Sequence, residues 1–111
     1  MTEALLDVLW AGSSLKDLKG FPDKVRAEFG HSLYTLQRGK NPSSYRPMTD
    51  IGIGVFELLE QDARAWYRII YYTRLKRKIV VLHCFEKKTN KTNINDVELA
   101  KKRLKEVFKG R

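Results

Sequence analysis

Residues 54–87 read GVFELLEQDARAWYRIIYYTRLKRKIVVLHCFEK and hold three runs rich in β-branched and aromatic side chains. The runs cover residues 54–60, 64–73 and 78–87, and each favours a β-strand. Only three or four residues separate one run from the next, which suffices for a hairpin but not for a crossover helix. The spacing therefore predicts an antiparallel meander of three strands.

The third run, residues 78–87, is apolar on both of its alternating sets of side chains. One set holds Ile79, Val81 and Phe85, and the other holds Val80, Leu82 and Cys84. Such a strand is typical of the middle of a sheet that is covered on both faces. An earlier apolar run, residues 4–10, and a helix near the C-terminus are the candidates for that cover.

Helical patterns flank the meander. Gly12-Ser13-Ser14 predicts a stop and a helix start, so a short helix is expected over 14–19. Apolar residues spaced by four, four and three predict a second helix over 22–38, which Gly39 ends. Residues 40–48 contain two prolines and are expected to form an exposed loop. An amphipathic helix is predicted over 95–109, with Asn95 and Glu98 at capping-box spacing.

The elements follow the order β-α-α-β-β-β-α over a chain of 111 residues. This order predicts an α+β fold in which two N-terminal helices and one C-terminal helix pack on an antiparallel sheet. The length fits one compact domain, residues 1–111. A lone Cys84 excludes an internal disulfide, and no apolar run is long enough to span a bilayer. We therefore expect a cytoplasmic protein without a membrane partner.

Positive charge is concentrated in the second half of the chain. Residues 62–111 hold 15 Lys and Arg against 5 Asp and Glu, whereas residues 1–61 hold 7 against 8. The whole chain has a formal net charge of +9, which favours a polyanionic partner, nucleic acid first. The bases lie among aromatic residues, a composition typical of RNA-binding sheets because cations bind phosphate and rings stack on bases. The candidates for RNA binding are Arg64, Tyr67, Tyr71, Lys91 and Lys102.

A site of this kind also has residues suited to cleaving RNA. Cleavage without a metal requires deprotonation of the 2′-hydroxyl, stabilisation of negative charge on the phosphorus, and protonation of the leaving oxygen. Arg68, Lys87 and Lys88 are candidates for the second task. Glu57, His83 or a Lys with a lowered pKa are candidates for the base.

Each candidate base also has a structural interpretation. His83 lies within an apolar strand, with the parity of Val81 and Phe85, which fits a hydrogen-bonded core histidine. Glu57 is equally suited to pair with Arg68. The sequence has no Cys/His spacing typical of a zinc site, no phosphate-binding glycine loop and no hydrolase motif, so we expect no metal and no cofactor.

Several ordered motifs resemble one protein family. They include Leu36-Gln37-Arg38-Gly39, Arg46-Pro47-Met48, Gly54-Val55-Phe56-Glu57-Leu58, Trp66-Tyr67-Arg68-Ile69-Ile70-Tyr71 and Leu82-His83-Cys84-Phe85-Glu86-Lys87-Lys88-Thr89. In this order and spacing the chain resembles the phage-derived, HigB-like branch of the RelE/ParE toxin superfamily over nearly its whole length.

The resemblance implies the toxin of a type II toxin-antitoxin system, a metal-independent endoribonuclease that cleaves mRNA in the ribosomal A site and so inhibits translation. It implies a cognate antitoxin, of the HigA-like helix-turn-helix kind. It assigns Arg68, Lys87 and Lys88 to phosphate binding and transition-state stabilisation. Several members of the superfamily end in a strand with a catalytic His or Tyr, whereas this chain ends in a predicted helix without either.

Two other functions fit the same residues. One is a non-catalytic RNA- or protein-binding module of phage origin. The other is a ParE-like gyrase poison, which shares the fold without the nuclease chemistry.

Overall fold

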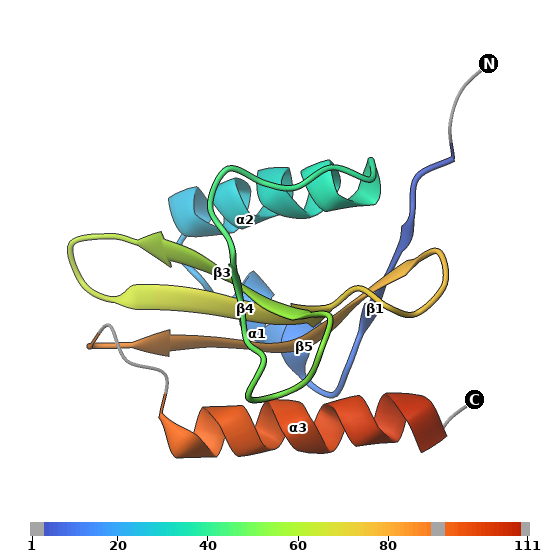
Figure 1. Ribbon diagram of the computed structural model, residues 1–111. Coiled ribbons are helices and arrows are strands. Elements are labelled where there is room, and N and C mark those ends of the chain that lie inside the picture. Colours follow the sequence, from blue (N-terminus) through green and yellow to red (C-terminus); the bar gives the residue numbers. More distant parts are fainter. Residues whose placement is uncertain (1–3, 90–92, 110–111) are drawn as a thin grey trace.

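A computed structural model describes residues 4–89 and 93–109 of the chain. Within these residues it contains five strands and three helices (Figure 1). In chain order they are β1 (Asp7–Trp10), α1 (Ser14–Lys19), α2 (Asp23–Gln37), β2 (Arg46–Pro47), β3 (Val55–Gln61), β4 (Trp66–Tyr72), β5 (Lys78–Lys87) and α3 (Ile94–Lys109). The predicted α+β class is confirmed.

The meander forms as the spacing predicts. The sheet has the order β1-β5-β4-β3-β2, and β3 pairs antiparallel with β4, as β4 does with β5. β5 lies between β1 and β4, and its residues from Ile79 to Phe85 are buried, as its two apolar sets indicated.

The first strand corrects one expectation. β1 does not cover a face of β5 but lies beside it in the sheet, in parallel, with Asp7 opposite Lys78 and Trp10 opposite Val81. The sheet is therefore mixed rather than antiparallel. The long connection that a parallel partner requires contains α1, α2 and the strands β2 to β4.

A bulge at Leu82 changes the register of β5. Tyr71 pairs with Val81 and Ile70 pairs with His83, so Leu82 has no opposite residue on β4. One extra residue in a strand reverses the alternation of side chains beyond it. Leu82 and Phe85, three positions apart, consequently pack in the same apolar cluster. The interpretation that His83 shares the parity of Val81 is wrong for this reason.

Two apolar clusters lie on opposite faces of the sheet. On one face, α1 and α2 contribute Leu18, Val25, Phe29 and Leu33, which pack on alternate residues of β3, β4 and β5. On the other face, Ala100 and Leu104 of α3 pack on the remaining set. Figure 1 shows α2 and α3 on the two sides of the sheet. The face under α3 also carries the charged residues described below.

The element boundaries differ from the expected ones by more than one residue at three places. The first strand covers 7–10 instead of 4–10, and the second meander strand begins at Trp66 because residues 62–65 form a turn. The expected loop over 40–48 contains the two-residue strand β2, which extends the sheet beside β3. Among the described residues, no helix has the length and apolar character needed to cross a bilayer.

Gly12 provides a test of how β1, α1 and α3 fit together. Gly12 has a φ of +52°, and an added Cβ would lie 2.6 Å from Nε of Arg103 on α3. We expect Gly12→Ala to lower the free energy of unfolding by about 1–2 kcal/mol, because the left-handed backbone disfavours a Cβ.

Urea denaturation measures this loss, and Gly30→Ala is the matched control. Gly30 lies within α2, and a Cβ there meets no atom within 4 Å, so the change should stabilise by about 0.5–1 kcal/mol. In an Arg103→Ala background the cost of Gly12→Ala should shrink. Equal costs in both backgrounds would show that the Arg103 contact is irrelevant.

Candidate nucleic-acid interface

Two arginines from neighbouring strands donate to the same carboxylate oxygen of Glu57. Oε1 of Glu57 on β3 accepts hydrogen bonds from Nη1 of Arg68 on β4, at 2.7 Å, and from Nε of Arg46 on β2, at 2.8 Å. The register of the sheet explains the contact, because Arg46 lies opposite Glu57 and β4 follows directly. The side chains of Glu57 and Arg68 are fully buried, whereas that of Arg46 is 59% exposed.

Arg68 is therefore not exposed, as a residue assigned to phosphate binding would be. It is the third residue of β4 and faces Glu57 inside the fold. A buried arginine is tolerated when a carboxylate pairs with it, since unpaired burial of either charge is costly. The structural interpretation of Glu57, that it pairs with Arg68, is confirmed. The exposed charge of this trio is Arg46, which the sequence analysis did not assign to the site.

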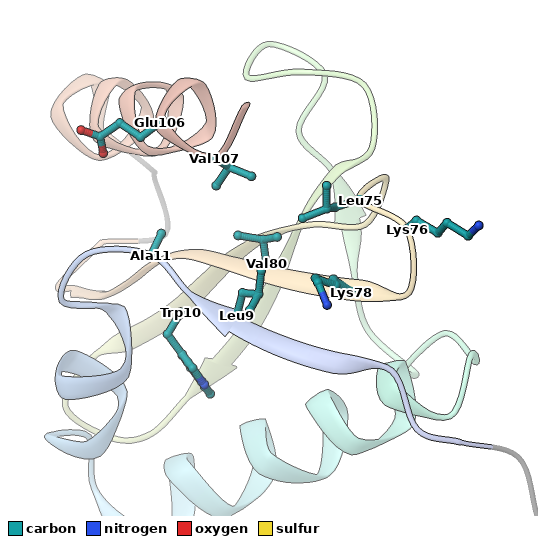
Figure 2. Close-up of a pocket in the computed structure, with 9 residues that line it drawn as sticks. All are labelled: Leu9, Trp10, Ala11, Leu75, Lys76, Lys78, Val80, Glu106 and Val107. Carbon is teal, nitrogen blue, oxygen red and sulfur yellow. The ribbon is translucent and has the colours of Figure 1, made fainter. Parts of the chain in front are cut away.

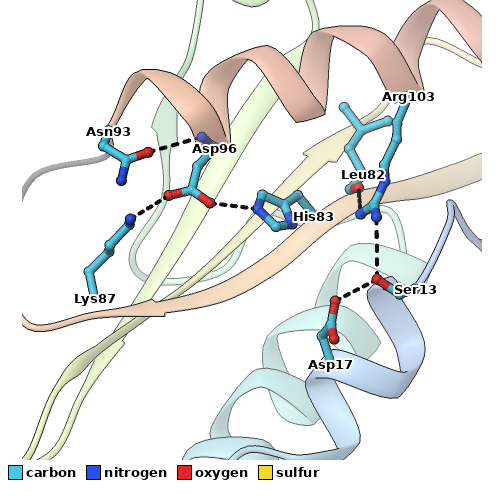
Figure 3. Close-up of polar contacts among 8 residues, drawn as sticks. All are labelled: Ser13, Asp17, Leu82, His83, Lys87, Asn93, Asp96 and Arg103. Carbon is cyan, nitrogen blue, oxygen red and sulfur yellow. Dashed lines mark hydrogen bonds and ion pairs between the residues drawn. The ribbon is translucent and has the colours of Figure 1, made fainter.

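A second network joins the end of β5 to the start of α3 (Figure 3). The carboxylate of Asp96 lies between His83 and Lys87, with Oδ1 at 2.8 Å from Nε2 of His83 and Oδ2 at 2.8 Å from Nζ of Lys87. His83 and Lys87 reach α3 only because the bulge turned this part of β5 toward it. The network therefore depends on the sheet register as much as on the residues themselves.

His83 is a core residue in this structure. Its ring stacks on Phe85 with centroids 4.5 Å apart, and 9% of its side chain is exposed. Its Nδ1 is buried and has no hydrogen-bond partner within the described residues. Burial lowers the pKa of His83 below its ordinary value, although Asp96 acts in the opposite direction. The ring has no nitrogen directed at solvent, as a general base would need.

Lys87 and Lys88 lie side by side at the end of β5 but in different surroundings. Lys87 is partly buried, with 23% of its side chain exposed, and is paired with Asp96. Lys88 follows the strand, is exposed, and forms no ion pair with any residue that the structure describes. Lys88 is thus available to an external anion, whereas the ammonium group of Lys87 is occupied by Asp96.

Asp96 is a residue of the candidate site that the sequence analysis did not identify. The capping box was placed at Asn95 and Glu98, but the side chain of Asn93 caps α3 by accepting a hydrogen bond from the backbone N–H of Asp96, at 3.0 Å. Asn93 and Asp96 have the same spacing as the expected pair, two residues earlier. This second pair at capping-box spacing was the signal in the sequence that could have indicated Asp96 at the start of α3.

The two tyrosines expected to stack on RNA bases lie in the core instead. Tyr67 is 2% exposed, packs against Phe21 in the cluster beneath α1 and α2, and donates a hydrogen bond to Asp62. Tyr71 is 1% exposed and stacks on Phe56. Both belong to the cluster beneath α1 and α2, on the face opposite Lys87. The structure therefore does not bring these rings to the lysines.

The remaining RNA-binding candidates are dispersed. Arg64 is exposed in the turn between β3 and β4, where Oδ1 of Asp62 accepts hydrogen bonds from the backbone N–H groups of Arg64 and Ala65. These bonds lower the pKa of Asp62, which keeps the turn charged and closed. Lys102 is exposed on α3. Lys91 lies outside the described residues.

Arg103 of α3 connects β5 to the N-terminal part of the fold. Nη1 of Arg103 donates to the carbonyl oxygen of Leu82 at 2.9 Å, and Nη2 donates to Oγ of Ser13 at 3.3 Å (Figure 3). Oγ of Ser13 in turn donates to Asp17, at 2.8 Å. Arg103 thus satisfies the carbonyl of the bulged residue and fixes α3 against the start of α1.

Two further groups bear on the chemistry. Cys84 is buried in the N-terminal cluster, and burial raises its pKa to about 12, so it is a neutral thiol at pH 7. Within residues 4–89 and 93–109, no group of three or more His, Cys, Asp or Glu side chains is arranged to hold a metal ion. The charged groups that the structure offers to a ligand at this end of the sheet are cations, chiefly Arg46, Lys87 and Lys88.

The buried pair predicts how substitutions at Arg68 behave. Arg68→Met removes the buried arginine that pairs with the buried Glu57 and leaves the exposed Arg46, so we expect the free energy of unfolding to fall by about 3 kcal/mol. The double variant Arg68→Met, Glu57→Leu removes both charges and should recover most of that loss. Urea denaturation of the single and double variants measures both values. A small loss in Arg68→Met would mean that the pair does not stabilise the fold.

His83 predicts a pH dependence of stability. Its lowered pKa means that the folded state binds a proton less readily than the unfolded chain, whose histidines titrate near about 6.5. His83 therefore contributes stability that is fully present above about pH 6.5 and decreases as the pH falls toward the folded-state pKa.

Denaturation between pH 7.5 and 5.5 measures this slope in wild type, in His83→Asn and in His31→Asn. The exposed His31 on α2 serves as the control. Removal of His83 should flatten the slope and removal of His31 should not. An unchanged slope in His83→Asn would assign the dependence to other groups.

Comparison with known proteins places the chain in a family. In the crystal structure of the toxin-antitoxin complex RelBE2 from Mycobacterium tuberculosis, one chain aligns with a TM-score of 0.51 and 18% identity, covering 79% of this chain and 98% of that one. At this identity the likeness concerns the fold. No curated protein matches the sequence. The model of the family "Phage derived protein Gp49-like (DUF891)" matches residues 16–105, and the chain therefore belongs to the Gp49-like family.

Proposed function

We propose that this protein is the toxin of a type II toxin-antitoxin system and acts as a HigB-like, ribosome-dependent mRNA endonuclease. The observation that carries the proposal is the pair Lys87 and Lys88 at the end of β5, one paired with Asp96 and one exposed, together with the Arg46–Glu57–Arg68 trio on the same sheet. The fold shared with a chain of the RelBE2 toxin-antitoxin complex supports it, as does the family.

The proposed chemistry is phosphodiester cleavage by the ribose 2′-hydroxyl. The 2′-oxygen attacks the adjacent phosphorus and loses its proton, and the bond to the 5′-oxygen breaks and that oxygen gains a proton. Negative charge grows on the phosphoryl oxygens in the transition state, so fixed cations nearby lower the barrier. Lys88 is accessible for this role, and Lys87 joins it when a phosphate replaces Asp96.

The trio of Arg46, Glu57 and Arg68 adds positive potential to the same face of the sheet. Two arginines share one carboxylate, so the trio carries a net charge of +1. Arg46 presents that charge at the surface, while Arg68 acts through Glu57 by holding the carboxylate in place. In this proposal Arg68 is a positioning residue and Arg46 contacts phosphate.

The proposed partners are mRNA in the ribosomal A site and a cognate antitoxin, HigA-like and of the helix-turn-helix kind. A net charge of +9 gives the protein affinity for ribosomal RNA, and its surplus in residues 62–111 coincides with β4, β5 and α3. The same charge favours an acidic neutralising protein. Arg64 and Lys102 are exposed and available to either partner.

Controlled expression in bacteria with mapping of mRNA 5′ ends tests this function. Wild-type protein should arrest growth and create new 5′ ends inside reading frames, and these ends should disappear when translation initiation is blocked. The double variant Lys87→Ala, Lys88→Ala should reduce cleavage by at least about 100-fold, because two phosphate-binding cations contribute several kcal/mol to the transition state.

The control is Lys16→Ala, Lys24→Ala, which removes the same charge from exposed positions on α1 and α2, on the other face of the sheet. It should retain cleavage. Growth arrest with intact mRNA would indicate a gyrase-directed toxin, and absence of arrest would indicate a binding module without catalysis. Full toxicity in a folded Lys87→Ala, Lys88→Ala protein would remove both lysines from the mechanism.

A further inference from the structure

An apolar groove lies at the edge of the sheet, between β1 and the C-terminal half of α3 (Figure 2). It has a volume of about 580 Å³, and its apolar lining includes Leu9, Ala11, Leu75, Val80 and Val107. Leu9 is 39% exposed even though it lies in a strand. Within the described part of the chain, no element covers this apolar surface.

The backbone of β1 is open on the same side. β1 is the terminal strand of the sheet, and its other neighbour in the ladder is absent among the described residues. The N–H groups of Asp7 and Ala11 donate to β5, to the carbonyls of Arg77 and Val81. Because backbone groups alternate along a strand, those of Val8 and Trp10 point away from β5, toward the open edge.

Charge around the groove is mostly positive. Lys76, from the hairpin before β5, and Lys78, the first residue of β5, both line the groove. Glu106 of α3 is the acidic residue that lines it. Lys78 has a weak contact with Asp7, at 3.5 Å between Nζ and Oδ2, whereas Lys76 is exposed. A chain of net charge +9 with cations at this edge disfavours pairing with a second copy of itself.

We infer that this edge is a docking surface for an extended, acidic segment of a partner protein, which adds a strand to β1. The segment would bond to the outward backbone groups of Val8 and Trp10. Alternate apolar side chains would enter the groove beside Leu9 and Val107, and carboxylates between them would meet Lys76 and Lys78. Backbone pairing supplies affinity, while the groove and the charges select the sequence.

The docking surface is separate from the proposed nuclease site. β5 begins at Lys78 beside the groove and ends at Lys87, nine residues later, a distance of about 30 Å. The inference therefore goes beyond the proposed function and does not require it. Where that function holds, the segment belongs to the antitoxin and binds without occupying Lys88.

Two displayed libraries of ten-residue peptides test the inference. Both have apolar residues at alternate positions, and the positions between are Asp or Glu in one library and Lys or Arg in the other. Peptides selected on the full-length protein are then labelled and their dissociation constants measured by fluorescence anisotropy. A Trp66→Phe background leaves Trp10 as the one tryptophan, so its emission reports binding at β1.

The matched variants are Val8→Pro and Val8→Ala. Both shorten the side chain, but proline also removes the outward N–H and leaves the ladder with β5 unchanged. We expect peptides from the acidic library, a change in Trp10 emission, at least 10-fold weaker binding to Val8→Pro than to Val8→Ala, and about 10-fold weaker binding to Lys76→Glu. Circular dichroism and thermal unfolding verify that each variant is folded.

Each contrary result overturns the inference. Selection of peptides from the basic library only, or from neither library, would show that the edge does not bind an acidic segment. Equal binding to Val8→Pro and Val8→Ala would show that the peptide does not add a strand to β1. Competition between the selected peptides and an RNA oligonucleotide would place the peptides at Lys87 and Lys88 instead. A wild-type dimer that Val8→Pro dissociates in analytical ultracentrifugation assigns the edge to a second copy of the chain.

Discussion

The structure depends on the bulge at Leu82 in the interior strand β5 and on the hydrogen bond that Arg103 donates to the carbonyl oxygen of Leu82. β5 is buried on both faces, so an unsatisfied carbonyl there would cost about 1–3 kcal/mol. The donor is Arg103 of α3. The bulge in β5 and the packing of α3 on the sheet therefore depend on each other. The same arginine reaches Ser13, which adds the start of α1 to this joint.

The altered register also creates the candidate site. Beyond Leu82, the side chains of His83, Phe85 and Lys87 lie on the α3 face of the sheet, which also carries Arg68 and Glu57. A regular strand would have directed these β5 residues into the apolar cluster beneath α1 and α2. The Arg46–Glu57–Arg68 trio and the His83–Asp96–Lys87 network therefore lie on the same face of the sheet. Buried, paired charges hold the exposed cations of that face in position.

The two proposals use different parts of the same sheet. The lysine pair lies at the end of β5, where the strand leaves the sheet and its side chains are accessible. The groove lies at the opposite end, where a parallel edge strand leaves backbone groups unpaired and apolar side chains exposed. A long central strand keeps them apart, so a partner protein and an RNA can be recognised by different surfaces of a small domain.

Local patterns in the sequence determined the elements and the charge. Strand runs, hairpin spacing and helical periodicity predicted the meander, the three helices and the α+β class, because these signals lie within a few residues of each other. Glu57, Arg68, Lys87 and Lys88 were also selected from the sequence as candidates, and the pairing of Glu57 with Arg68 was one of the stated alternatives. The tertiary structure decided what no local pattern contains. It set the parallel pairing of β1, the bulge in β5 and the burial of Arg68, Tyr67 and Tyr71. It also set the ionic and hydrogen-bond contacts of Asp96, Arg46 and Arg103. Each of these depends on residues far apart in the chain, and their positions follow from register and packing rather than from spacing along the sequence.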